Sequence, residues 1–444
     1  MKQIIENLFK LNRTILGEGI DNAFEYLKHL LDFKIYEFKT GETYGTWTIP
    51  QEWIVKDAWV KHKGQKIIDY QKQPLSLMVY AEPFKGIIDK DELKKHLFIS
   101  DEKPQAIPYE YSFYKKQWGF SVPKDFVYKK ANVCLDCTND LRDIDPAVGK
   151  VRIDGITDKE TFIDNLKNGK YEVFIDTEFR DGIMKVAEYT IKGESDREII
   201  LIAHLDHPFQ ANDNLSAVAC LVDLAKKIKC KHTVKIVLCP ETIGSAAYAL
   251  SRDLSKTDFV ISVECIGNKN SVLLQKSWKA DCRINKVAHL AVSNSGEDYR
   301  KGNFRSLLGG DEYVFNDPNL NIPGILLSRF PFDEYHTSAD TPDKIDYENI
   351  EKIQKIILKI IDIYEKDYIP VKVFDGTLFR EKFGVQTFEK KLNLAMDYFI
   401  YAIDGKTPLS LIVSDCGLNF DYCYSLLEEL KKSDHISVNN CETK

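Results

Sequence analysis

Hydrophobic and polar residues follow two different periods along this chain, and the changes of period divide it into segments. In the first 38 residues, apolar side chains recur every three or four positions, beginning with Ile4, Ile5 and Leu8. That spacing predicts amphipathic helices. From about residue 40 to about 135, Tyr, Trp, Val and Ile alternate with polar residues between prolines and glycines, as in TYGTWTIPQEWIV. This alternation predicts a small β-rich module.

From about residue 170 onward, short apolar runs alternate with helical patterns. The runs REIILIAH, TVKIVLCP, DFVISVE and PGILLSRF read as buried strands, while SAVACLVDLAKKI and AAYALSRDL read as helices between them. Such alternation predicts an α/β fold with a mostly parallel, doubly wound sheet. Ligands bind such sheets beyond the carboxyl ends of the strands. His204, Glu241 and Glu264 each lie at the end of one predicted strand.

The C-terminal part of the chain is helical again. The stretch NIEKIQKIILKIIDIY closes the α/β region as an amphipathic helix, and three short helical patterns separated by Gly and Pro follow Pro370. These three patterns predict a winged-helix or helix-turn-helix module. We therefore expect three domains: an α/β domain formed by residues 1–39 and 136–370, an inserted β-rich domain at 40–135, and a winged-helix domain at 371–444.

The stretch AHLDHPFQANDNLSAVACL, residues 203–221, holds the first candidate chemistry. His204, Asp206, His207 and Asp213 precede an abruptly apolar helix. Burying such a polar cluster costs free energy unless a partner compensates it, and a metal ion is a suitable partner. Zinc binds His nitrogen and carboxylate oxygen. Further donors of these types follow along the chain, namely Glu241, Glu264 and His336.

These motifs together resemble the co-catalytic zinc aminopeptidases, a family that includes bacterial leucyl aminopeptidases and glutamate carboxypeptidase II. The resemblance rests on HLD, NDNLS, PETIGS, VECIG and YHTSADTPDKID in this order. It is strongest to a bacterial aminopeptidase-like subgroup with an inserted β module and a C-terminal winged helix. The resemblance implies a zinc-peptidase fold with one or two Zn²⁺ ions per chain.

Carried over by position, the resemblance implies a ligand set. His204, Asp213 and Glu264 would bind one zinc, and Asp213, Glu241 and His336 would bind the second, so that Asp213 bridges. Asp206 would accept a hydrogen bond from the far nitrogen of His204 and fix its tautomer. The resemblance also implies a cis peptide bond between Asp213 and Asn214.

One departure from the family pattern affects the chemistry. The family has two adjacent glutamates at the third motif, a general base and a zinc ligand, whereas this chain has only Glu241, between Pro240 and Thr242. Glu241 is then either the ligand, which we favour, or the base. If Glu241 is the ligand, Glu312 and Glu334 are the candidate substitutes for the base.

Two more residues remain open at this point. His207 is read either as a third imidazole that binds substrate or replaces a ligand, or as a hydrogen-bonded histidine at a strand end. Asp311, in GGDEYVF, matches a family aspartate near the substrate. The β-rich insert is likewise read either as a module whose Trp and Tyr form its own core, which we favour, or as a wall of the active-site cleft.

The resemblance predicts a hydrolase that cleaves a peptide or amide bond next to a free amine by metal-activated water. Because a glutamate is missing, two alternatives stay open. One is a non-catalytic, aminopeptidase-like metal- or ligand-binding protein, and the other is a single-zinc acyl transferase of the glutaminyl cyclase type. The expected substrate is a small peptide or an amidated small molecule.

Composition and charge limit the classes of binding partner that we expect for this chain. The net charge is −7, which does not favour nucleic acid or an anionic membrane surface. No run of about 18 apolar residues predicts a membrane span. Ten cysteines without a secretion signal, including the pair Cys134 and Cys137, predict reduced thiols in a cytoplasmic protein. The C-terminal module is acidic, so we expect it to serve protein contact or homo-oligomerisation rather than DNA binding.

Overall fold

The computed structural model describes residues 1–130, 162–383 and 390–441, and it divides into two compact units. Unit 1 comprises Met1–Gln51, Asp181–Phe332 and Thr341–Lys444, and unit 2 comprises Glu52–Arg180 and Asp333–Asp340. The β-rich insert thus begins at Glu52 and also takes in a short segment from far along the chain. Cys134 and Cys137 lie outside the described residues.

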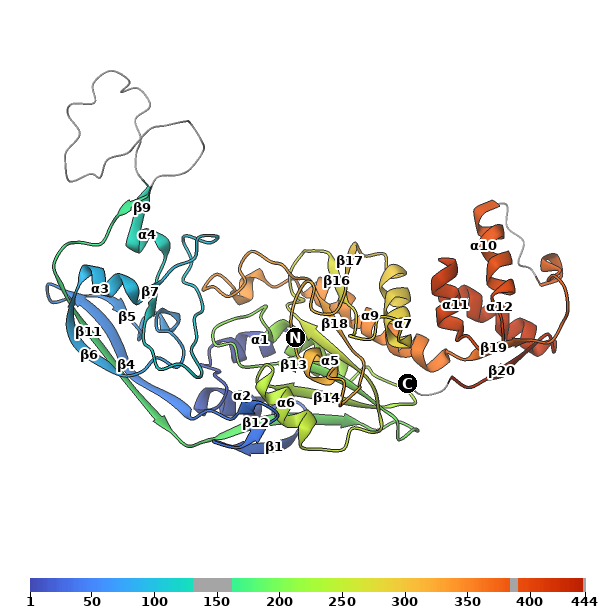
Figure 1. Cartoon of the computed structure of the whole chain (residues 1–444), viewed down its shortest axis with the longest axis horizontal. Helices are drawn as coiled ribbons and strands as arrows, with labels where there is room; N and C mark the ends of the chain where they lie inside the picture. The colour runs from blue at the N-terminus through green and yellow to red at the C-terminus, as the bar shows by residue number, and fades with distance from the viewer. Residues whose placement is uncertain (131–161, 384–389, 442–444) are drawn as a thin grey trace, which may run out of the picture. The chain divides into compact units, whose positions relative to one another are not determined.

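Unit 1 contains an eight-stranded mixed sheet (Figure 1). Its strands, in spatial order, are β1 (Lys34–Lys39), β12 (Ile183–Ile191), β14 (Thr233–Cys239), β13 (Glu198–His204), β15 (Thr257–Glu264), β18 (Gly324–Ser328), β16 (Val272–Gln275) and β17 (Tyr299–Gly302). The central strands β14, β13, β15 and β18 run parallel. β12 pairs antiparallel with both β1 and β14, and β16 pairs antiparallel with β18 but parallel with β17. The α/β class is confirmed, with a mixed, mostly parallel sheet.

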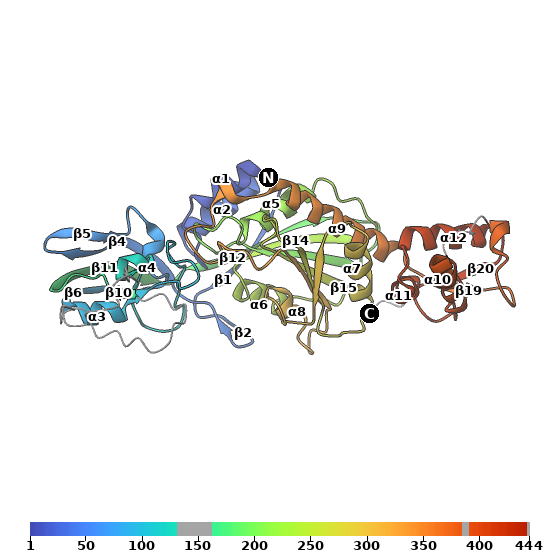
Figure 2. The ribbon, with the colours of Figure 1, turned by 90° about the horizontal axis from the view of Figure 1, so that it is seen from above.

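Helices cover both faces of this sheet, as Figure 2 shows. On one face lie α1 (Lys2–Phe9), α2 (Glu18–Lys28), α5 (Leu215–Leu224) and α9 (Tyr347–Lys366), and on the other lie α6 (Ile243–Leu250) and α8 (Glu312–Phe315). α7 (Arg283–Ser293) packs on α9. All residues of α5 except Asp223 are buried, which explains its uniformly apolar sequence. α9 is amphipathic, and the side chain of Asp346 caps its first turn by accepting the Asn349 N–H.

The central strands end together at one edge of the sheet. His204 is the last residue of β13, Glu264 is the last residue of β15, and Glu241 follows the end of β14 by two residues. Since β14, β13 and β15 are adjacent and parallel, their carboxyl ends bring these three positions into one region.

Unit 2 is built on a four-stranded antiparallel sheet, in the order β5 (Gln65–Asp69), β4 (Glu52–His62), β11 (Lys170–Arg180) and β6 (Phe84–Asp89). Trp59 stacks on Phe174 across the β4–β11 pair at 5.3 Å between ring centroids. Trp53 is buried and stacks on Tyr80. Aromatic residues therefore contribute to the unit's own packing. Its shorter elements are η1 (Pro74–Ser76), α3 (Lys90–Lys95), β7 (Leu97–Phe98), β8 (Phe120–Ser121), α4 (Lys124–Val127), β9 (Tyr128–Lys130) and β10 (Phe162–Asp164).

The C-terminal region belongs to unit 1. Its three predicted helices are present as α10 (Lys390–Tyr401), α11 (Leu409–Cys416) and α12 (Phe420–Lys432). A two-stranded antiparallel sheet, β19 (Ile369–Lys372) with β20 (Ile436–Asn439), accompanies them. The assignment as a winged helix stays a prediction. The remaining elements of unit 1 are β2 (Thr43–Tyr44), β3 (Trp47–Thr48), η2 (Pro342–Lys344) and η3 (Arg380–Phe383).

Within the parts of the chain that are described, no helix combines the length and the apolar character that crossing a bilayer requires.

Candidate metal centre

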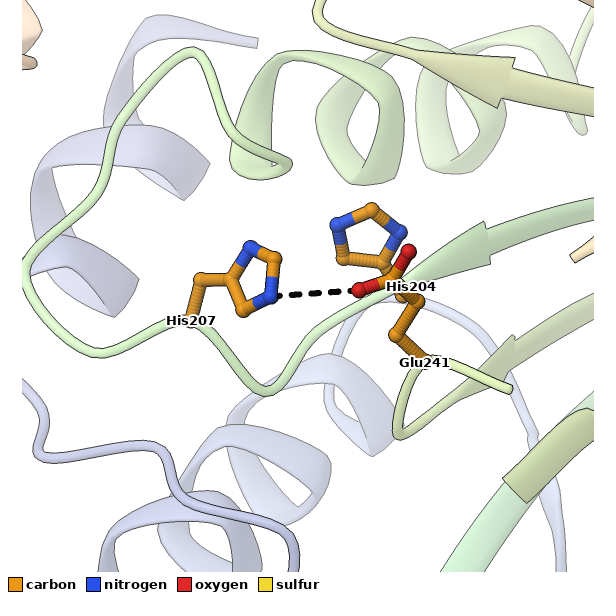
Figure 3. Close-up of side chains that lie close together, drawn as sticks. All are labelled: His204, His207 and Glu241. Atoms are coloured by element: carbon orange, nitrogen blue, oxygen red, sulfur yellow. Dashed lines mark ion pairs between the residues drawn. The ribbon is translucent and has the colours of Figure 1, made fainter. Parts of the chain in front are cut away.

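A buried cluster of histidines and carboxylates lies at the carboxyl edge of the unit 1 sheet (Figure 3). Asp213 joins the two histidines: its Oδ1 lies 3.0 Å from His204 Nε2, and its Oδ2 lies 3.0 Å from His207 Nδ1. His207 Nε2 in turn lies 3.4 Å from Glu241 Oε2, the contact dashed in Figure 3. The side chains of the two histidines and Asp213 are at most 7 % exposed, while that of Glu241 is 31 % exposed. Glu241 is therefore the cluster's most solvent-accessible member.

Two overlapping groups in unit 1 have donor atoms spaced to hold a metal ion. One is His204, His207 and Glu241, and the other is His204, Glu264 and Asp311, with all donor atoms within 4.8 Å of one another. His204 Nδ1 is 4.0 Å from Glu264 Oε1 and 3.9 Å from Asp311 Oδ2. Ligands that each lie about 2.0–2.2 Å from one zinc ion are at most about 4.4 Å apart, so the two His204 separations fit a shared ion.

Asp311 shows the need for a cation most directly. Its Oδ1 accepts hydrogen bonds from the Thr242 N–H at 2.9 Å and from the Ser245 hydroxyl at 2.6 Å. Its Oδ2 is buried without a hydrogen-bond partner among the residues described, and it faces His204. Burial raises the pKa of Asp311 to about 6. A buried carboxylate oxygen that no donor satisfies is what a metal ion would compensate.

The electrostatics of the cluster also indicate a site that attracts positive charge. Burial alone would lower the pKa of His204, but the carboxylates of Glu241 and Asp213 outweigh burial and raise that pKa to about 10. Burial raises the pKa of Glu264 well above its usual range, with further contributions from neighbouring carboxylates. Several acids therefore lie close together around the buried His204, which is the arrangement that a dication neutralises.

The loop between β13 and α5 carries His207 and Asp213, and we call it the ligand loop. Two asparagines hold its second half against the end of β15. The Asn214 side chain donates to Val263 O at 2.9 Å and accepts the Cys265 N–H at 3.0 Å. The Asn212 Oδ1 accepts the Gly267 N–H at 2.7 Å. The peptide bond between Asp213 and Asn214 is cis, as the family resemblance implied.

Asp206 contacts a different partner from the one expected. Its Oδ1 accepts the backbone N–H of Glu241 at 2.8 Å, where the sequence analysis predicted a hydrogen bond to His204. The ring nitrogens of His204 instead lie near Asp213 Oδ1 at 3.0 Å and Asn214 Nδ2 at 3.4 Å. Asp206 thus positions the backbone of Glu241.

Glu312, a candidate base, is fully buried beside Asp311 on α8. Its Oε1 accepts a hydrogen bond from Gln275 Nε2 at 3.1 Å. Burial raises the pKa of Glu312 to about 8. Neither group of metal-spaced donors in unit 1 includes Glu312.

The other two predicted residues of this chemistry, His336 and Glu334, belong to unit 2. The His336 carbonyl accepts the Tyr109 N–H at 2.8 Å, and its ring stacks on Tyr335 at 3.9 Å between centroids. The roles of His336 as a ligand of the second zinc and of Glu334 as a base stay predictions.

Backbone conformation is unusual next to two of the candidate ligands. Thr242, which follows Glu241, has φ of 59°, and Cys265, which follows Glu264, has φ of 52°. Residues other than glycine rarely adopt this left-handed region, and such positions cluster at functional sites.

Sequence reasoning missed several residues that shape the site. Gly310 is one, because a Cβ there would lie 1.8 Å from Glu264 Oε1, so only glycine leaves room for that carboxylate. Ser245 is another, since it orients Asp311. The motif GGDEYVF contained the signal for Gly310, whereas Ser245, although part of the motif PETIGS, was given no role.

Comparison with known proteins places the chain in a family. The model of a domain of unknown function, DUF4910, matches residues 2–367. The chain belongs to the DUF4910 family. A Clostridium acetobutylicum protein, provisionally named a polysaccharide biosynthesis protein with an aminopeptidase-like domain, is 31 % identical over 373 residues, covering 82 % of this chain and 77 % of that protein.

Solved structures of other proteins are similar to this DUF4910 chain. A crystal structure from Clostridium acetobutylicum, provisionally named a peptidase, is 26 % identical with a TM-score of 0.77 and covers 99 % of this chain and 96 % of the other. A zinc aminopeptidase from Bacillus subtilis is similar at a TM-score of 0.54 and 10 % identity, over 81 % of this chain and 94 % of the other. The latter likeness shows that this DUF4910 chain has an aminopeptidase-type fold.

Proposed function

We propose that this DUF4910 protein is a zinc-dependent, aminopeptidase-like hydrolase that cleaves a peptide or amide bond next to a free amine. The observation that carries the proposal is the buried His204–Asp213–His207 cluster with Glu241, Glu264 and Asp311 around it, at the carboxyl edge of an aminopeptidase-type sheet. Such a donor set and edge position are typical of catalytic zinc sites.

In this proposal, the residues of the cluster bind the metal ions. His204, Glu264 and Asp213 would hold one ion, and Asp213 with Glu241 would contribute to a second, while the ligand role of His336 stays a prediction from the sequence. Bound zinc supplies Lewis acidity towards a carbonyl oxygen and acidifies water. Of the cluster members in unit 1, Glu241 is the most exposed, so we propose it as the ligand on the side of the site that substrate reaches.

Asp206 supports that role of Glu241. Because Asp206 accepts the Glu241 N–H, it fixes the backbone from which the Glu241 carboxylate projects. His207 contacts both Asp213 and Glu241, so we propose that it joins the metal ligands rather than binding substrate. Substrate specificity is proposed to include amidated sugars beside small peptides, since one relative carries polysaccharide biosynthesis in its name.

The deciding experiment is metal stoichiometry by mass spectrometry on zinc-reconstituted protein, with wild type, Glu241→Gln and Glu198→Gln side by side. Glu198 is a matched control, since it begins the strand that His204 ends and pairs with Lys235 at 2.7 Å. We expect two ions in wild type and Glu198→Gln and fewer in Glu241→Gln. One ion in wild type would favour a single-zinc acyl transferase, and none would leave a non-catalytic binding protein.

Activity is then tested on aminoacyl anilides, short peptides and amidated sugars. Hydrolysis that requires a free α-amine and stops on chelation supports the proposal. Two bound ions with no turnover of any amine-bearing amide would contradict the hydrolase and retain only the metal site.

A further inference from the structure

Arg13 is the largest fully buried side chain of the chain as described, although it lies in the short segment between α1 and α2. Its guanidinium donates to four backbone carbonyls. Arg13 Nε bonds to Leu205 O at 2.9 Å, and Nη2 bonds to His207 O and, at 3.2 Å, to Gln210 O. Arg13 Nη1 bonds to Leu8 O near the end of α1. Three of the four acceptors therefore belong to a single stretch of chain, residues 205–210.

That stretch is the first half of the loop that carries the candidate ligands. It leaves β13 at His204, passes through His207 and reaches Asp213. Asn212 and Asn214 bind the second half to the end of β15, as described above. The first half has Arg13 at three of its carbonyls, and Phe209 within it has φ of 55°. The loop is thus held at both ends, by asparagines on one side and by Arg13 on the other.

We propose that Arg13 is a positioning residue of the metal centre, which holds the backbone of residues 205–210 so that His207 faces Asp213 and Glu241. This inference rests on the proposed function. A planar guanidinium offers five N–H donors in a fixed fork, so it can hold several carbonyls at once. Lysine places a single point charge and cannot span the same set.

The inference is tested first by zinc affinity. Competition with a chromogenic chelator is measured on full-length wild type, Arg13→Lys and Arg283→Lys. Arg283 is a matched control, because it is a largely buried arginine of unit 1 that binds Asp367 and the Tyr364 carbonyl but not the ligand loop. We expect zinc affinity to fall about 10- to 100-fold in Arg13→Lys, as for other residues that orient metal ligands, and to stay unchanged in Arg283→Lys.

A second measurement separates positioning from general destabilisation. Hydrogen exchange of metal-free protein is followed in peptides covering residues 203–216 and in peptides from β15. In Arg13→Lys we expect faster exchange confined to the loop, and in Arg13→Ala we expect millimolar guanidinium to restore both slow exchange and zinc affinity. Exchange that rises equally throughout unit 1, with no rescue by guanidinium, would make Arg13 a general stability residue and overturn the inference.

The outcomes distinguish the two proposals. Wild-type zinc binding with equal affinity in Arg13→Lys overturns the role of Arg13 and leaves the proposed function standing. A wild type that binds no zinc overturns the proposed function together with the link from Arg13 to metal. The local exchange result then decides whether Arg13 orders the loop.

Discussion

His232 lies far from the metal centre, at the amino end of β14, between two carboxylates. Its Nδ1 is 2.9 Å from Glu365 Oε1 and its Nε2 is 3.1 Å from Asp258 Oδ2, and its side chain is 15 % exposed. Arg197 also pairs with Asp258. Burial alone would lower the pKa of His232, but the hydrogen bonds to Asp258 and Glu365 outweigh burial and raise that pKa to about 9. The imidazole is therefore protonated at neutral pH.

The magnitude follows from this pKa. Against an unfolded value of 6.5, a folded value of about 9 corresponds to a ceiling of about 3 kcal/mol, because each unit is worth about 1.4 kcal/mol. Partial exposure reduces this, and we expect about 2 kcal/mol. Since the folded pKa is the higher one, the contribution is complete below pH 6.5 and is lost as the pH rises through 9.

The assay compares wild type with His232→Gln by urea unfolding, followed by circular dichroism between pH 6 and 10. Other groups titrate alike in both proteins, so the difference in their unfolding free energies isolates His232. That difference should fall by about 2 kcal/mol over this range. His289→Gln is the control, because burial and nearby lysines lower the pKa of His289 and its difference should not fall as pH rises. A His232 difference that is constant with pH would refute the reasoning.

Two further substitutions test the metal centre and the buried ion pair between Arg283 and Asp367. Gly310→Ala should lower zinc affinity about 10-fold or more, because the added Cβ displaces the Glu264 carboxylate. Gly309→Ala is the control: its Cβ meets only the end of a flexible arginine side chain, so it should bind zinc like wild type in the same chelator competition. Equal zinc affinity of Gly310→Ala and wild type would contradict this prediction. Asp367→Asn should lower the unfolding free energy by about 3 kcal/mol, because it leaves the largely buried Arg283 without its carboxylate partner. A loss below about 1 kcal/mol in urea unfolding would show that this ion pair contributes little to stability.

The strand ends of the candidate site follow from the sequence pattern. His204, Glu241 and Glu264 each close an apolar run of strand length, and parallel strands bring their carboxyl ends to one edge. The α/β class, the alternation of strands and helices, and the three C-terminal helices were predictable from the spacing of apolar residues. Periodicity reports which face of an element is apolar, and that information is local.

The residues that sequence reasoning missed depend on contacts between distant segments. Asp311 was predicted only as a residue near the substrate, and its contact with His204 was missed because four strands and three helices separate the two residues along the chain. Arg13 lies 192 positions before Leu205. From the sequence alone, a charged residue between two helices is expected to be exposed to solvent. The pairing of β1 with β12, and the grouping of residues 333–340 with the insert, likewise depend on tertiary contacts that no local period encodes.

The pairing of β1 with β12 has a consequence for synthesis on the ribosome. β1 ends at Lys39 and its partner begins at Ile183, so the edge of the unit 1 sheet cannot form until about 150 further residues, including most of unit 2, have been made. At about 5–20 residues per second, this leaves the N-terminal segment waiting for roughly 8–30 s. During that time the apolar faces of α1 and α2 have no sheet to cover. Chaperone demand should therefore concentrate on the first 40 residues of the nascent chain.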